Sequence, residues 1–289
     1  MTEPLLYFTD QLFETNRSTN YTTASAIAEL VDNSIDWHAS KVQIIFVEKM
    51  INGSEVIEKI IVSDDGVGMD QDMVTRCLIS GHHGEREDEN GRIGKFGVGL
   101  PEASRSQARR IKAFGWEKGK PTYLHALDLD TVTGISVTPA IEKDLMDVDI
   151  DMIGGKSESG TVIIWENCDR LSNVRSDTNV LHTERLLGRV YRYFLEKNSI
   201  EIIFKKFKFN KLTQDYDLAE PETKARAMDP LYLMENTTIS QALFTESNTG
   251  KIEADYYKKF SESKTKSKPT SELFVDKCDK KTFEFGQAQ

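Results

Sequence analysis

Glycine is concentrated in one stretch of this chain. Six of its 18 glycines lie within the 19 residues from 81 to 99. Glycine weakens helices and strands because it loses more conformational freedom on folding than any other residue. Turns alone do not account for this density, and we expect a polar loop between folded elements. The six residues are Gly81, Gly84, Gly91, Gly94, Gly97 and Gly99.

The overall composition is that of a folded globular protein. Of the 289 residues, 38% are hydrophobic and 29% are charged, which excludes a disordered or collagen-like chain. The net charge of -10 repels polyanions, so any nucleic-acid contact must be local. The three cysteines form no CxxC pair, which favours a reducing cytoplasm over a disulfide framework or a thiolate zinc site. No apolar run is long enough to span a membrane, and no signal peptide is recognisable.

The hydrophobic pattern predicts an α+β fold. Apolar residues recur at helical spacing within 22–36, and a threonine can cap the start of that helix. Two β-rich runs, 41–48 and 57–63, are separated by the turn sequence Asn52-Gly53-Ser54 and predict a hairpin. Further strands are expected within 122–138, 160–166 and 200–204, and further helices over 98–110 and 181–196.

Two polar residues lie on the face of the first expected helix opposite its apolar stripe. Glu29 and Asn33 are four residues apart and therefore stack on one side. A carboxylate can activate water, and an amide oxygen suits Mg²⁺. From this segment alone, a catalytic pair and a solvated helix face that also carries Asp32 and Asp36 are both open.

An acidic pair and two glycines follow the second strand of the expected hairpin. The sequence Asp64-Asp65-Gly66-Val67-Gly68 places a carboxylate beside backbone that a flat ring can approach closely. A tight turn is the alternative interpretation.

The end of the glycine-rich stretch can hold phosphate. Residues 94–99 lead into an expected helix, so backbone N–H groups and the helix dipole can bind an anion, with Lys95 as a point charge. No GK[ST] sequence closes this loop, and the segment before it is polar loop rather than strand. A Walker A loop and a dinucleotide fingerprint are therefore excluded.

The order of these motifs resembles the GHKL ATPase superfamily, which includes gyrase-type topoisomerases, ninety-kilodalton heat-shock chaperones, MutL, histidine kinases and MORC proteins. AIAELVDNSID at 26–36 is similar to gyrase and MORC, IGKFGVGL at 93–100 to the chaperones, and SGTVIIW at 159–165 to the last motif. The resemblance covers about residues 5–205. The GHHG sequence and LLGRVYRYF at 186–194 are most similar to MORC proteins and their bacterial relatives.

The resemblance implies a Bergerat-type ATP-binding sandwich over residues 1–208, a mixed, largely antiparallel sheet covered by helices. A partial second α/β region, transducer-like or a C-terminal extension, would occupy 209–289. Glu29 would activate the hydrolytic water, Asn33 would coordinate Mg²⁺, and Asp64 would accept a hydrogen bond from the adenine amino group. The other residues implied to contact ATP are Gly66, Gly68, Gly94, Lys95, Gly97, Val98, Gly99 and Thr161.

The implied function is a Mg²⁺-dependent ATPase with slow turnover, in which ATP closes the loop as a lid and drives N-terminal dimerisation. The apolar segment 5–13 is the candidate pairing surface. One alternative is an ATP-binding interaction module with negligible hydrolysis. Another is a protein kinase of the same superfamily, disfavoured because none of the 28 residues before Glu29 is a histidine. A DNA or protein client is left open.

Three further clusters are expected to be structural. His82 and His83 are interpreted as polar lid residues rather than metal ligands. Arg105, Arg109 and Arg110 are left unassigned: at helical spacing such arginines more often form a solvated face, and a phosphate patch is the other possibility. The lysine-rich run 258–268 is interpreted as a solvated loop; a lysine that senses phosphate, or a local DNA contact, is the alternative.

Overall fold

The computed structural model describes residues 17–18, 20–81, 97–131, 140–155 and 157–228, together with the short strands β11 (Thr245–Glu246) and β12 (Ile252–Glu253). These residues belong to two compact units. The first takes in the chain up to Leu187 and Asn198–Ala225, and the second takes in Gly188–Lys197 and the chain from Arg226. Four segments with sequence-based interpretations lie outside the described residues: 5–13, 82–83, 94–95 and 258–268.

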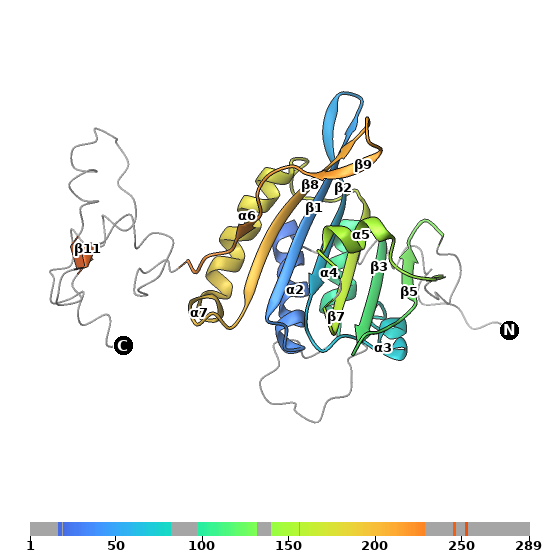
Figure 1. The fold of residues 1–289 in the computed structure, drawn as a ribbon, viewed down its shortest axis with the longest axis horizontal. Helices are drawn as coiled ribbons and strands as arrows, with labels where there is room; N and C mark the ends of the chain where they lie inside the picture. Colours follow the sequence, from blue (N-terminus) through green and yellow to red (C-terminus); the bar gives the residue numbers. More distant parts are fainter. Residues whose placement is uncertain are drawn as a thin grey trace. The chain divides into compact units, whose positions relative to one another are not determined.

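The first unit is built on one mixed sheet (Figure 1). Its strand order is β10 (Thr223–Lys224), β8 (Glu201–Asn210), β1 (Lys41–Ile51), β2 (Ser54–Asp64), β7 (Gly160–Cys168), β3 (Ala108–Glu117), β5 (Leu124–Asp128) and β6 (Ala140–Glu142). Strand β4 (Lys120–Pro121) pairs with β3, and β9 (Asp215–Leu218) pairs with β8. Strands β1 and β8 are parallel, whereas the other pairs are antiparallel. The predicted α+β class, with a mixed and largely antiparallel sheet, is confirmed.

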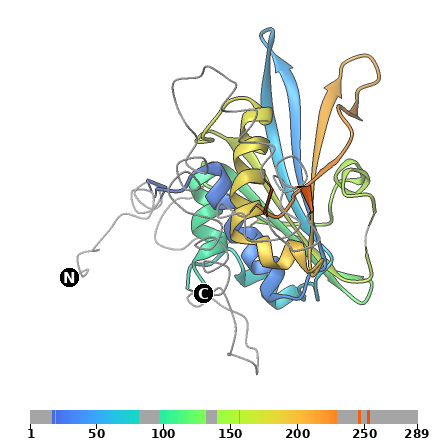
Figure 2. The ribbon, with the colours of Figure 1, turned by 90° about the vertical axis from the view of Figure 1, so that its left-hand side faces the viewer.

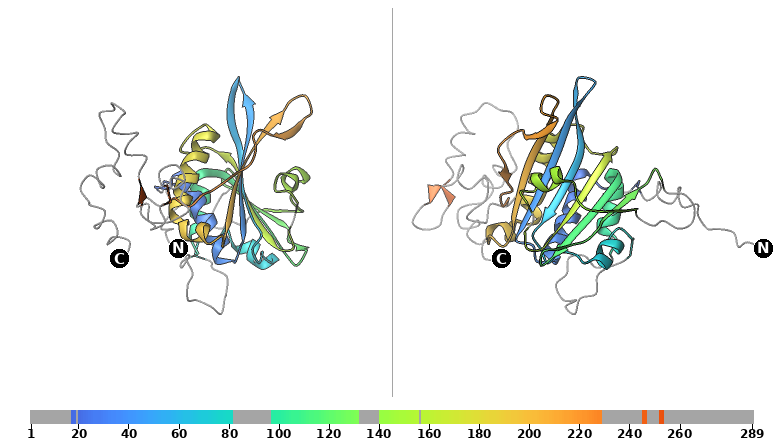
Figure 3. Two further views of the ribbon diagram at one scale, coloured as in Figure 1. Left: turned by 60° about the vertical axis from the view of Figure 1, so that its left-hand side comes forward. Right: turned by 45° about the vertical axis from the view of Figure 1, so that its right-hand side comes forward.

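Helices cover the two faces of this sheet unequally. Helices α2 (Thr23–Asp36) and α4 (Gly99–Gln107) pack together on one face, and α6 (Ser176–Val190), as far as Leu187, lies on the same side (Figure 2). The short α5 (Asp147–Met152) lies against the opposite face (Figure 3). Helix α3 (Gln71–Arg76) follows β2 after a short loop. None of the helices in the described ranges is long and apolar enough to cross a membrane.

The sequence pattern explains why α2 forms and how it is oriented. Ile27, Leu30 and Val31 are almost fully buried, so the predicted apolar stripe faces the sheet. At the start of the helix, Thr22 and Ser25 form a capping box, in which each side chain bonds to the backbone of the other residue. Glu29 and Asn33 lie away from this stripe and are partly buried.

The expected helix over 98–110 is too long. It ends at Gln107, and β3 begins at Ala108 because that segment pairs with β7 on one side and β5 on the other. Arg109 and Arg110 therefore lie on a strand, and Arg105 is only 4% exposed, which corrects the solvated helix face. The acidic partners are Asp130 and Asp169 for Arg109, and Glu142 and Glu166 for Arg110.

In the second unit, the segment that begins at Arg226 contacts the last residues of α6, from Gly188 onward. The backbone N–H of Met228 donates to the Gly188 carbonyl at 2.8 Å. A Cβ at Gly188 would lie 2.6 Å from the Arg226 carbonyl oxygen, so only glycine permits this approach. Helix α7 (Arg192–Glu196) and the antiparallel pair β11–β12 also belong to this unit.

Candidate nucleotide site

Helix α2 presents the predicted catalytic and metal-binding residues together. The Asn33 side chain donates through Nδ2 to the backbone carbonyl of Glu29 at 2.9 Å. Because a carbonyl can only accept, this bond identifies the amide nitrogen and leaves Oδ1 for a ligand. The Asn33 amide oxygen, one helical turn from Glu29, is therefore a candidate neutral oxygen ligand.

Asp64 stands at the end of β2, opposite Thr161 of β7 in the strand register. Its carboxylate accepts hydrogen bonds from the Ser34 hydroxyl and from the Gly66 N–H, each at 3.0 Å. Burial raises the pKa of the Asp64 carboxyl to about 6, although the bonds from Gly66 and Ser34 oppose the rise. The Asp64 carboxylate, which accepts hydrogen bonds when ionised, is thus held beside Thr161, and its burial costs solvation free energy.

Its neighbour Asp65 has a different role. The Asp65 carboxylate accepts from the Ser40 N–H at 2.8 Å, the Ser40 hydroxyl at 2.7 Å and the Lys41 N–H at 2.7 Å. These three bonds anchor the start of β1 to the end of β2. Of the two adjacent acids, Asp64 is therefore the candidate for ligand binding, and Asp65 supports the sheet.

The two glycines after Asp65 are required by the packing of the chain itself. Gly68 has φ +83°, and a Cβ there would lie 1.9 Å from the Trp116 carbonyl oxygen. A Cβ at Gly66 would lie 2.6 Å from the Trp37 carbonyl oxygen. The loop can therefore close against the sheet only without side chains at these positions. Their contact with a base stays a prediction.

The two ends of the glycine-rich loop meet. The N–H of Gly81 donates to the Gly97 carbonyl at 3.0 Å, and both residues have positive φ, +84° and +61°. Val98 is the N-cap of α4, and Gly99 is its first residue. Gly94 and Lys95, the other predicted phosphate ligands, lie outside the described residues.

The start of α4 lies against Glu29. A Cβ placed on Gly99 would be 2.4 Å from Glu29 Oε2, so the carboxylate occupies the space that a side chain at Gly99 would take. Glu29, the candidate base, thus lies next to Gly99, 70 residues further along the chain, at the helix start where phosphate binding was predicted.

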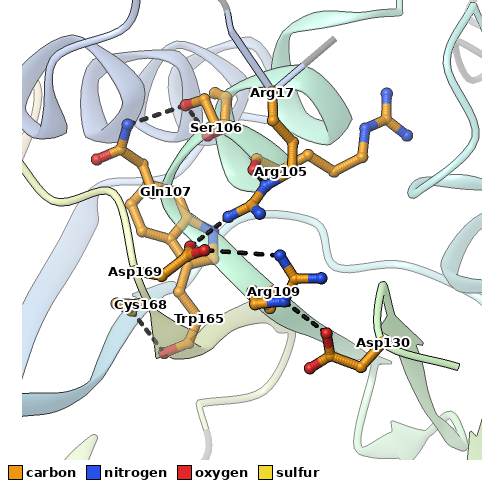
Figure 4. Close-up of polar contacts among 10 residues, drawn as sticks. Arg17, Arg105, Ser106, Gln107, Arg109, Asp130, Trp165, Cys168 and Asp169 are labelled. Atoms are coloured by element: carbon orange, nitrogen blue, oxygen red, sulfur yellow. Dashed lines mark hydrogen bonds and ion pairs between the residues drawn. The ribbon is translucent and has the colours of Figure 1, made fainter. Parts of the chain in front are cut away.

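The entry to α2 is fixed by polar contacts with the end of α4 and with the chain after β7 (Figure 4). Arg17 is only 2% exposed, donates through Nε to the Arg105 carbonyl at 2.9 Å, and forms an ion pair with Asp169. Thr23 donates through its hydroxyl to Gln107 Oε1 at 2.8 Å. These contacts hold the helix that carries Glu29 against the helix that begins at Gly99.

The described residues contain no group of three or more His, Cys, Asp or Glu side chains arranged to hold a metal ion. The Asn33 amide oxygen is of the donor type that Mg²⁺ prefers, and α4 packs against α2 on the same face of the sheet.

Residues 21–161 match a family described as histidine kinase-, DNA gyrase B- and HSP90-like ATPases. This segment is a GHKL-type ATPase domain. The ATPase domain is also similar to Protein MICRORCHIDIA 6 of Arabidopsis thaliana, with 23% identity over 133 residues. That match covers 46% of this chain but only 20% of the relative's length. The resemblance to MORC proteins is thereby supported.

Among solved structures, the chain is similar to the N-terminal domain of a DNA repair protein. The TM-score is 0.44 at 18% identity, and the match covers 75% of this chain and 57% of the other.

Sequence reasoning missed two residues of this ATPase domain that support the site. Ser34 holds Asp64 from α2, and Asp65 fixes the strand start. The sequence predicted the hairpin, and its two open ends lie close together. The hydrogen bonds of Asp65 with Ser40 and Lys41 follow from that closeness. The Ser34 contact depends on how α2 lies across β2, which the sequence pattern does not specify.

Proposed function

We propose that this ATPase domain binds ATP with Mg²⁺ and hydrolyses it slowly, and that ATP closes the lid and pairs two chains at their N-termini. The position of the Glu29 carboxylate against the first residue of α4 carries this proposal. A general base must lie within reach of the water it activates, and the start of α4 is where phosphate oxygens would be held.

Each remaining site residue then has a distinct part. Asp64 accepts from the adenine amino group, with Thr161 beside it, and Gly97, Val98 and Gly99 supply backbone N–H groups to the phosphates. Asn33 contributes an oxygen ligand to the metal. A bound Mg²⁺ would neutralise phosphate charge, so catalysis would rest mainly on positioning and electrostatics.

Single-turnover hydrolysis of ATP by the wild type and by Glu29→Gln tests the proposal. We expect the variant to be slower by about a hundredfold or more at unchanged ATP affinity, because it keeps the shape of the side chain but loses the base. Equal rates would instead favour an ATP-binding interaction module. Transfer of the labelled γ-phosphate to an added protein would favour a kinase.

The metal role of Asn33 has its own test. Asn33→Ala should weaken ATP binding in the presence of Mg²⁺ more than in EDTA, since the amide acts through the metal. Equal losses under both conditions would make Asn33 a structural residue of α2.

We further propose that the conformational change acts on a DNA or protein client in the cytoplasm. The net charge of -10 means that a DNA contact would require a local basic surface.

A further inference from the structure

His125 of β5 is a buried polar side chain that the proposed chemistry does not use. It is only 1% exposed, and burial lowers the pKa of its ring, which is therefore neutral at pH 7. Its neighbour Leu124 belongs to the hydrophobic cluster that includes Met152 of α5. Because successive side chains of a strand point to opposite faces, His125 lies on the face of the sheet that carries α2 and α4.

Helix α3 provides the contacts of this ring. The Nε2 atom of His125 lies 3.1 Å from Nε2 of Gln71 and 3.2 Å from the hydroxyl oxygen of Thr75. Gln71 and Thr75 are four residues apart and share one face of α3. In one tautomer of the neutral ring, the His125 nitrogen accepts from the Gln71 amide, and in the other it donates to Thr75. Either bond holds α3 to β5.

Gln71 also binds the backbone at the start of β5. Its Oε1 accepts from the Tyr123 N–H at 2.7 Å. Because a backbone N–H can only donate, this bond identifies the amide oxygen, and the amide nitrogen is the atom that faces His125. One side chain thus joins α3 to the backbone before β5 and to a buried side chain within that strand.

Helix α3 begins where the loop after Asp64 ends. Asp70 is the N-cap of the helix, and Gln71 is its first residue. One residue earlier, Met69 lies directly on β3: a Cβ at Gly115 would be 2.7 Å from the Met69 Cβ and 2.9 Å from its carbonyl oxygen. The two glycines predicted to contact the base therefore lie in a loop that has the Asp64 carboxylate at one end and Gln71 at the other.

We propose that Gln71 and His125 are positioning residues for the adenine base. By holding α3 against β5, they fix the far end of the loop, and with it the backbone that the base would approach beside Asp64. This inference rests on the proposed binding of ATP. A loop that is already held in its bound course loses less conformational freedom when a ligand binds, so these contacts raise affinity without touching the nucleotide.

The first test compares two substitutions of the buried ring. His125→Phe keeps a planar ring and removes its nitrogens, whereas His125→Gln places an amide near the position of Nε2. We expect His125→Phe to weaken the binding of adenosine and of ATP equally, by about tenfold, because the two ligands share the base. His125→Gln should bind both within about twofold of the wild type.

Calorimetry with adenosine and with ATP measures these affinities. His182→Phe is the matched control, because His182 is exposed on α6, and its affinities should not change. Unchanged adenosine affinity in His125→Phe would overturn the proposal.

Gln71→Met is a second variant, and it decides the matter if His125→Phe does not fold. Gln71 is exposed, and methionine has a similar length but lacks the amide, so both bonds of this side chain are removed. We expect adenosine binding to weaken about fivefold, because Thr75 remains as a contact of the ring. Single-turnover hydrolysis at saturating ATP should keep the wild-type rate, since the loop positions the base and not the phosphates. A slower rate with unchanged adenosine affinity would overturn the proposal.

Asp64→Asn separates this inference from the proposed function. If adenosine binds the wild type no better than it binds Asp64→Asn, the nucleotide site itself is refuted. If adenosine binding depends on Asp64 but not on Gln71 or His125, only the positioning role is refuted.

Discussion

At the scale of single residues, burial disfavours the ionised form of Asp64, which is the form that the proposed hydrogen bond from adenine requires. Its pKa is raised to about 6, so the carboxylate becomes protonated as the pH falls through that value. A protonated Asp64 would offer the adenine amino group a poorer acceptor. We therefore expect binding to be about tenfold weaker at pH 5 than at pH 8. Adenosine is the matched ligand for calorimetry, because it has no phosphate to titrate; equal affinities at the two pH values would remove Asp64 from the site.

The same residue should make the empty protein less stable above pH 6. Because the folded pKa exceeds the ordinary value of 3.8, folding favours the protonated form, and stability rises as the pH falls from about 6 to about 4. Asp64→Asn should remove this rise and, at pH 7, increase the free energy of unfolding by on the order of 1 to 3 kcal/mol, while abolishing ATP binding.

Asp65→Asn is the control, and its effect should have the opposite sign. An amide that accepts fewer of the three bonds from Ser40 and Lys41 lowers the free energy of unfolding. Denaturant titrations of both variants decide the matter. Stabilisation by both substitutions, or by neither, would contradict the distinct roles assigned to these neighbours.

At the scale of elements, the sequence predicted what depends on local pattern. The cap at Thr22, the apolar stripe of α2 and the β1–β2 hairpin all follow from side-chain period and turn residues, and the structure confirms them. The boundary between α4 and β3 was wrong because Arg109 and Arg110 are held by strand pairing and by acids distant in sequence. Strand pairing of this kind cannot be predicted from a short stretch of sequence, because the partners are distant along the chain. For the same reason the contact of Ser34 with Asp64 was not predicted.

Helix α5 provides a prediction about stability that is separate from the site. Lys59 of β2 and Asp149 of α5 form an ion pair whose side chains are 7% and 2% exposed. Removing Asp149 takes away the ion-pair partner of the buried Lys59 ammonium, which still lies over the Tyr216 ring, 5.6 Å from its centroid. We expect Asp149→Ala to lower the free energy of unfolding by about 3 kcal/mol. ATP affinity should stay the same, since α5 lies on the face of the sheet opposite α2.

Asp151→Ala is the matched control for α5, because Asp151 is exposed on the same helix. Its effect in a urea titration should stay within about 0.5 kcal/mol. A comparable loss in both variants would mean that the helix, rather than the buried pair, accounts for the stabilisation.

At the scale of the whole molecule, the proposed switch predicts that ATP changes the state of association. Phosphate contacts made only when the proposed lid is closed would give ATP a higher affinity for the closed state. Only such a difference in affinity can shift the population of chains from open to closed. Gly81 and Gly97, at the base of the loop, are joined by a hydrogen bond and both have positive φ, a conformation that glycine adopts at little steric cost. ADP lacks the γ-phosphate and should shift the population less.

Light scattering with Glu29→Gln, which should retain ATP, measures the outcome. We expect twice the mass of one chain in ATP with Mg²⁺, and the mass of a single chain without nucleotide. ADP should give a smaller dimer fraction than ATP. Asp64→Asn is the control: because it cannot bind the base, it should remain a monomer at the same ATP concentration. A monomer for Glu29→Gln at saturating ATP would refute dimerisation and leave the nucleotide site intact, because the Asp64 and Asn33 tests do not depend on a second chain.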